Sequence, residues 1–151
     1  MERVELRKIS GGYDVPGFGT VTRAALLRPS KTVRDLRGRA FDVRARSRVT
    51  SVTDATGAQV GAFHRSFWTR HGTLRWGQEQ YEFRAGIWSS TYSLTRAARA
   101  LVTVRLRVFG VSEMTIAEPV DPLLALVVVA QALITKSYAG ASAAAGSGGA
   151  S

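Results

Sequence analysis

The stretch DPLLALVVVAQALITK (121–136) decides how this chain can fold, because it is the one segment that is apolar on every side. Asp121 is a suitable N-cap, Pro122 belongs at the first helical position, and Lys136 complements the C-terminal end of the helix dipole. These signals predict a helix from about Pro122 to Tyr138. A helix with one apolar stripe can lie on a sheet, but a helix that is apolar all round must be enclosed.

The rest of the chain predicts strands. β-Branched and aromatic residues alternate with polar ones between glycine or polar turns, which is the period-two pattern of antiparallel strands. The pattern occupies residues 20–27, 40–54, 58–65, 73–84, 90–96 and 100–110. An eight-stranded barrel is filled by its own side chains, so a barrel around a helix needs more strands. We therefore predict a mainly β fold, a closed antiparallel barrel of about ten to twelve strands that encloses the C-terminal hydrophobic helix.

The 151 residues suit a single domain, which we place at residues 1–138 with its central helix at about 122–138. Residues 139–151, AGASAAAGSGGAS, are low in complexity and predict a flexible tail. Shifting the sequence by about 42 residues superposes residues 41–60 on residues 83–102, with seven identities that include Phe41 on Phe83. Each copy reads strand, turn, strand, so either an internal repeat or a chance similarity in an alanine-rich chain explains the match.

The order of these elements resembles the tubby C-terminal-like superfamily, which includes tubby proteins, phospholipid scramblases and the plant LURP-one-related proteins. The resemblance is carried by VTSVTDATGAQVGAF (49–63) with its Asp-x-x-Gly turn, by the hairpin TLRWGQEQYEFR (73–84), and by EPVDPLLALVVVAQAL (118–133). It covers most of residues 1–138 and implies a bacterial-type member with a twelve-stranded barrel around a central helix. Because this chain is shorter than tubby, one or more strands could be absent. Superfamily members are associated with membranes, phosphoinositides or phospholipid movement, although no position here matches a lipid-contact motif.

Composition and motifs indicate binding rather than catalysis. The net charge of +10 and a sequence pI of about 11.2 favour anionic partners such as acidic lipid headgroups or nucleic acid. There is no cysteine, no Gly-x-Ser-x-Gly elbow, no Walker phosphate loop and no dinucleotide fingerprint. His64 and His71 are interpreted as surface or turn residues without a carboxylate cluster at metal-ligand spacing, and Asp54 as an Asx-turn residue. We predict no catalytic residue, no metal site and no cofactor.

Arginines on two strands supply the predicted lipid- or phosphate-binding site. Arg44, Arg46 and Arg48 alternate along one strand and therefore project from one face. Arg105 and Arg107 do the same on a later strand, with Val104, Leu106 and Val108 on the other face. Like charges this close repel one another, so an anionic ligand would stabilise them. The alternative interpretation is a solvated barrel exterior.

A basic and aromatic segment, FWTRH (67–71), adds further candidates. In a loop, Phe67 and Trp68 could enter a membrane interface or stack on a base, with Arg70 beside them as a phosphate ligand. The alternative is that the two aromatic side chains pack in the core.

These observations favour a non-enzymatic tubby-like module that binds anionic phospholipid or phosphoinositide at a membrane surface through its arginines. The predicted location is cytoplasmic, peripheral at the inner face of the membrane, because the charged N-terminus MERVELRKIS does not resemble a signal peptide. A nucleic-acid-binding β-barrel is the first alternative. The second is a scramblase-like or tail-anchored protein whose C-terminal helix enters lipid. The polar Gln131 and an apolar run shorter than the roughly 20 residues of a membrane span argue against it.

Overall fold

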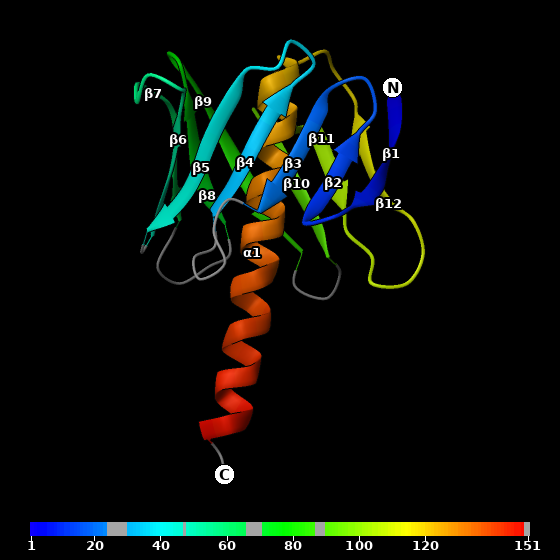
Figure 1. Ribbon diagram of the computed structural model, residues 1–151, viewed down its shortest axis with the longest axis vertical. Helices are drawn as coiled ribbons and strands as arrows, with labels where there is room; N and C mark the ends of the chain where they lie inside the picture. The colour runs from blue at the N-terminus through cyan, green and yellow to red at the C-terminus, as the bar shows by residue number, and fades with distance from the viewer. Residues whose placement is uncertain (24–29, 47, 66–70, 87–89, 150–151) are drawn as a thin grey trace.

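A computed structural model describes residues 1–23, 30–46, 48–65, 71–86 and 90–149 (Figure 1). Within these residues the chain forms twelve strands and one helix. The elements are β1 (Glu2–Ile9), β2 (Gly12–Val15), β3 (Gly19–Arg23), β4 (Ser30–Asp35), β5 (Ala40–Arg46), β6 (Val49–Thr53), β7 (Gln59–Arg65), β8 (Gly72–Trp76), β9 (Glu79–Ala85), β10 (Thr91–Arg96), β11 (Arg99–Arg105), β12 (Ser112–Ile116) and α1 (Pro122–Gly149). Each strand pairs antiparallel with the next, and β1 pairs with β12, so the sheet is a closed barrel. The predicted fold class is confirmed.

The first half of α1 is enclosed by the barrel, as its all-round apolar sequence requires. The side chains from Leu124 to Ala130 are at most 1% exposed. Asp121 caps the helix, because its Oδ1 accepts a hydrogen bond from the Leu123 N–H at 3.0 Å. The helix lies closest to β4, with β3, β5, β10 and β11 also beside it. The N-cap and the enclosure predicted from the sequence are confirmed.

Aromatic side chains from β7, β9 and β10 fill another part of the barrel interior. The rings of Phe63 and Phe83 meet edge to face with centroids 5.0 Å apart, and Tyr92 stacks on Phe83 at 6.0 Å. Such pairs bury large apolar areas in well-defined geometry. The core is therefore shared between an aliphatic helix and an aromatic cluster.

The barrel has two distinct ends, which Figure 1 shows at the top and the bottom. The helix begins at the end where the odd-numbered strands begin, and we call this the helix-entry end. It leaves at the end where the odd-numbered strands finish, which we call the helix-exit end, and its last turns project beyond the barrel there. Antiparallel pairing around a closed ring thus assigns every strand terminus to one of these two ends.

Several predicted boundaries differ from those of the structure. The segment 40–54, predicted as one strand, contains β5 and β6, so Arg48 lies beyond the end of β5 and does not alternate on one strand with Arg44 and Arg46. The helix continues past Tyr138 to Gly149, through the segment expected to form a separate tail. Alanine has the highest helix propensity, and the enclosed first half of α1 has already nucleated the helix, so the alanine-rich sequence propagates it. The strand predicted at residues 100–110 ends at Arg105. Val108 is consequently 75% exposed instead of facing inward.

The segments that superpose in the sequence also occupy equivalent elements. Residues 41–60 run from β5 through β6 into β7, and residues 83–102 run from β9 through β10 into β11. A register shift falls between Val52 and Thr53 in the first copy and between Leu94 and Thr95 in the second. Because these positions are also 42 residues apart, the two segments share an irregularity of the ladder as well as a strand order.

Candidate functional site at the helix-exit end

Charged residues are distributed unequally between the two ends of the barrel. We assign to an end the three residues of each strand that are nearest to it, together with the residues of the described connections there. At the helix-exit end the cations so assigned are Arg7, Lys8, Arg23, Lys31, Arg44, Arg46, Arg48, Arg65, Arg84, Arg105 and Arg107. The carboxylates assigned to that end in the described residues are Glu113 and Asp14, and Asp14 counts at both ends because β2 is only four residues long. Glu5 and Glu82 lie in the middle of their strands and are assigned to neither end, although Glu82 contacts Arg84. The excess positive charge of the chain is therefore gathered at the helix-exit end.

The helix-entry end, by contrast, is balanced. Its cations are Arg3, Arg34, Arg37, Arg39, Arg75, Arg96 and Arg99, and its carboxylates are Glu2, Asp14, Asp35, Asp42, Asp54, Glu79, Glu118 and Asp121. Three of these cations are in ion pairs within that end: Arg39 with Asp35 at 2.7 Å, Arg96 with Glu79 at 2.8 Å, and Arg99 with Glu118 at 3.0 Å. This end therefore offers little net attraction to an anion.

The arginines predicted on β5 are placed as expected from their alternation. Arg44 and Arg46 are exposed on either side of the inward position Ala45, and neither forms an ion pair with a described residue. The cross-strand neighbours of Arg44 are Ser30 and Ser51, which carry no charge. Nothing in the described sheet therefore neutralises these two guanidinium groups.

The other predicted arginines share the same end, where Arg48 lies beside β5 and where Arg105 and Arg107 lie on the opposite side of the barrel. Arg48 is exposed just beyond β5, and its carbonyl accepts the Arg65 N–H at 2.8 Å. Arg105 lies on β11, with Glu113 at 4.0 Å, and Arg107 is exposed past the strand end. Because β5 and β11 stand six strands apart in a ring of twelve, the two arginine groups lie on opposite sides of the barrel. Three further candidates, Phe67, Trp68 and Arg70, lie outside the described residues.

Further cations occupy inward-facing positions at the rim of the helix-exit end. Lys31 and Arg23 are direct cross-strand partners, two residues beyond the buried pair Val33 and Val21. Burial, and in addition the charge of Arg23, lowers the pKa of Lys31 below its ordinary value of 10.5. Two cations are thus held against each other at the mouth of the barrel, and an anion between them would relieve the repulsion.

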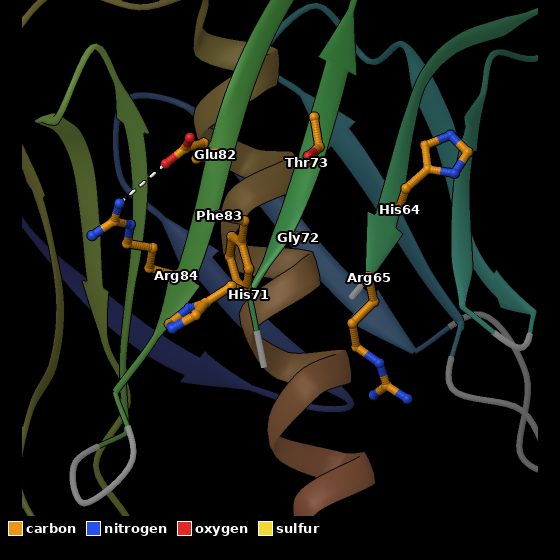
Figure 2. A pocket seen from close by; sticks show the side chains of 8 residues that line it. All are labelled: His64, Arg65, His71, Gly72, Thr73, Glu82, Phe83 and Arg84. Carbon is orange, nitrogen blue, oxygen red and sulfur yellow. Dashed lines mark hydrogen bonds and ion pairs between the residues drawn. The ribbon is translucent and has the colours of Figure 1, made fainter. Parts of the chain in front are cut away.

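An open pocket of about 550 Å³ lies on β7, β8 and β9 near the same end (Figure 2). Its lining residues are His64, Arg65, His71, Gly72, Thr73, Glu82, Phe83 and Arg84. Figure 2 shows His64 and Arg65 projecting on one side of it and His71 and Arg84 on the other. Arg84 Nη2 contacts Glu82 Oε2 at 3.2 Å. His64 and His71, interpreted from the sequence as surface or turn residues, therefore line one pocket with Arg65 and Arg84, and its donors suit an oxyanion.

Among the residues that the structure describes, no group of three or more His, Asp or Glu side chains is placed to hold a metal ion. The two histidine rings in Figure 2 also point in different directions.

A larger open pocket, of about 800 Å³, lies at the helix-entry end. Phe41, Val60, Trp76 and Leu123 form its apolar wall. The side chain of Asp54, on the rim of this pocket, stabilises the turn that follows it. Its Oδ1 accepts hydrogen bonds from the Thr56 hydroxyl at 2.6 Å and from the backbone N–H groups of Thr56 and Ala58. These bonds, led by that of the Thr56 hydroxyl, lower the pKa of Asp54, and they confirm its predicted Asx-turn role.

Comparison of the chain with models of protein families, with curated proteins and with solved structures finds no match. The resemblance to the tubby-like superfamily consequently stays a prediction. In the part of the chain that the structure describes, no helix is long and apolar enough to cross a membrane.

Sequence reasoning identified five of the cations at the helix-exit end but missed Arg7, Lys8, Arg23, Lys31, Arg65 and Arg84. These residues are scattered over the first half of the chain and beyond, and no motif joins them. The signal that could have found them is positional: they lie near every second strand boundary, where the chain repeatedly returns to one end of the barrel.

Proposed function

We propose that the chain is a non-enzymatic, tubby-like module that binds anionic phospholipid at a membrane surface through the cations of the helix-exit end. The observation that carries this proposal is the charge asymmetry between the two ends of the barrel. Each lysine or arginine close to an anionic bilayer contributes about 1 kcal/mol of attraction, so cations gathered at one end act together. Arginine adds bidentate hydrogen bonding to phosphate.

The arrangement of the cations favours a flat partner. Arg44 and Arg46 lie across the barrel from Arg105 and Arg107, so a ligand on one side of the barrel cannot reach both groups. A plane of negative charge placed against the helix-exit end can approach both. A lipid surface has this shape, whereas a nucleic-acid duplex lying along one side would meet only part of the ring.

The enclosed helix argues against the scramblase-like alternative. Insertion of α1 into lipid would require its most apolar segment, Leu124 to Ala130, to leave a site where it is almost fully buried. The last turns of α1 project from the end that is proposed to face the membrane, and residues 137–149 contain no charged residue, so in this arrangement they can enter lipid while Leu124 to Ala130 stay enclosed.

Vesicle sedimentation tests the proposal against the nucleic-acid alternative. We expect binding to phosphatidylcholine vesicles that contain 30% phosphatidylserine to exceed binding to pure phosphatidylcholine and to decrease with added NaCl. The variant Arg44→Glu/Arg46→Glu should lose at least about 30-fold in affinity, because removing two attractions of about 1 kcal/mol each already gives this factor.

The matched control is Arg34→Glu/Arg37→Glu, which makes the same change in net charge at the helix-entry end. It should bind vesicles almost as well as the unaltered protein. Equal loss in both double variants would show that only net charge matters, and tight binding to duplex DNA or RNA without vesicle binding would overturn the lipid proposal.

A further inference from the structure

The connection between β11 and β12 exposes apolar side chains at the helix-exit end. Val108 is 75% exposed, Phe109 92% and Val111 49%. Other large apolar side chains exposed in the described residues are Met1, Ile9 and Leu36, of which Ile9 alone shares this end. Exposed aromatic and branched side chains close together in sequence need an explanation, since water disfavours them.

Hydrogen bonds fix the base of this connection, at Leu106 and Arg107, and keep its tip, residues 108–111, away from the barrel wall. The buried Leu106 donates its N–H to the Ser90 carbonyl at 2.8 Å, and the Arg107 N–H donates to Ser112 Oγ at 2.9 Å. Gly110 takes a φ of +101°, a conformation that glycine adopts without strain, and turns the chain back toward β12. Residues 108–111 therefore project beyond the ladder with their side chains exposed.

Charge and apolar surface coincide at this connection. Arg105 and Arg107 precede the apolar tip, and the other cations of the helix-exit end lie around the same rim. Apolar side chains flanked by cations match the two layers of an anionic bilayer, in which negative headgroups lie just outside hydrocarbon. The complementarity between these cations and negative headgroups therefore favours a lipid surface as the binding partner.

We propose that Val108, Phe109 and Val111 form a wedge that enters an anionic bilayer and fixes the barrel end-on, with the helix-exit end toward the membrane. This inference rests on the proposed lipid binding and adds to it an orientation and an inserting segment. The helix-entry end, with the exposed Leu36, then faces away from the lipid.

Site-specific labelling can test the wedge directly, because the chain contains no cysteine. Phe109→Cys and the matched control Leu36→Cys each provide one thiol at a highly exposed apolar position, on opposite ends of the barrel. Each would carry an environment-sensitive nitrobenzoxadiazole label and be mixed with vesicles of 30% phosphatidylserine in phosphatidylcholine. We expect a blue shift, a rise in emission and quenching by acyl-chain nitroxide lipids at position 109, with none of these at position 36.

An affinity measurement complements the labels. Phe109→Ser should weaken vesicle binding at least tenfold with an unchanged dependence on NaCl, because it removes apolar insertion and no charge. Leu36→Ser should leave the affinity unchanged.

The outcomes separate the two proposals. Salt-dependent vesicle binding with the label at position 109 still in water would overturn the wedge while the proposed lipid binding stands. Equal responses at positions 109 and 36 would overturn the end-on orientation. Absence of vesicle binding by the unaltered protein, or binding to nucleic acid alone, would overturn both.

Discussion

Replacing Gln131 by leucine is expected to stabilise the barrel. Gln131 lies within α1, 6% exposed, and its Nε2 donates only a long hydrogen bond of 3.3 Å to Thr135 Oγ1. Its Oε1 is buried without a hydrogen-bond partner among the described residues. The Thr135 hydroxyl donates to the Gln131 backbone carbonyl at 2.8 Å, a bond that the substitution leaves in place. Leucine would therefore remove an unsatisfied oxygen and leave the hydroxyl of Thr135 satisfied.

The magnitude follows from two opposing contributions. A buried polar atom without a partner costs about 1–3 kcal/mol, whereas a neutral hydrogen bond contributes about 0.5–1.5 kcal/mol and this long one belongs at the low end. The net gain for Gln131→Leu is thus about 1 kcal/mol in the free energy of unfolding. For a domain of this size that gain raises Tm by about 4 °C.

Urea unfolding followed by far-ultraviolet circular dichroism measures this change. Gln80→Leu on β9 is the matched control, because Gln80 is exposed and the same substitution there should change stability by less than about 0.5 kcal/mol. Destabilisation of Gln131→Leu by 1 kcal/mol or more would refute the reasoning, since it would mean that the amide oxygen is well satisfied in the folded protein.

Two further predictions concern the turns and the acid stability. Gly19 has a φ of +148°, and a Cβ there would overlap the backbone carbonyl oxygen of Arg34, so Gly19→Ala should cost at least about 2 kcal/mol. Gly17→Ala, at a φ of +84° with open space around the position, should cost about 1 kcal/mol, and similar urea midpoints for the two variants would contradict the close approach. The lowered pKa of Asp54 means that its contribution to stability is complete above the ordinary value of 3.8 and is lost as pH falls through the lower folded pKa. Asp54→Asn should therefore lose less stability than the unaltered protein between pH 5 and pH 2, and an unchanged pH profile would count against the role of this carboxylate.

The sequence by itself determined the central feature of the fold. A helix that is apolar on all sides must be enclosed, and the rest of this chain has the period-two pattern of strands that can form a barrel around it. Both patterns are local, because they depend on backbone geometry and on which side chains avoid water. For the same reason alternation alone correctly placed Arg44 and Arg46 on the outside of β5.

Only the tertiary structure decided where the helix and the strands end and which residues share an end of the barrel. β11 ends at Arg105 because Arg107 bonds to Ser112 rather than continuing the ladder, a contact that the period-two pattern does not contain. Antiparallel pairing places cations such as Lys8, Lys31 and Arg84 at one edge of the sheet, and the closure of β1 against β12 bends that edge into a ring. The local pattern predicts the individual strands. The basic end arises from how the strands pair around the whole barrel, which no local pattern contains.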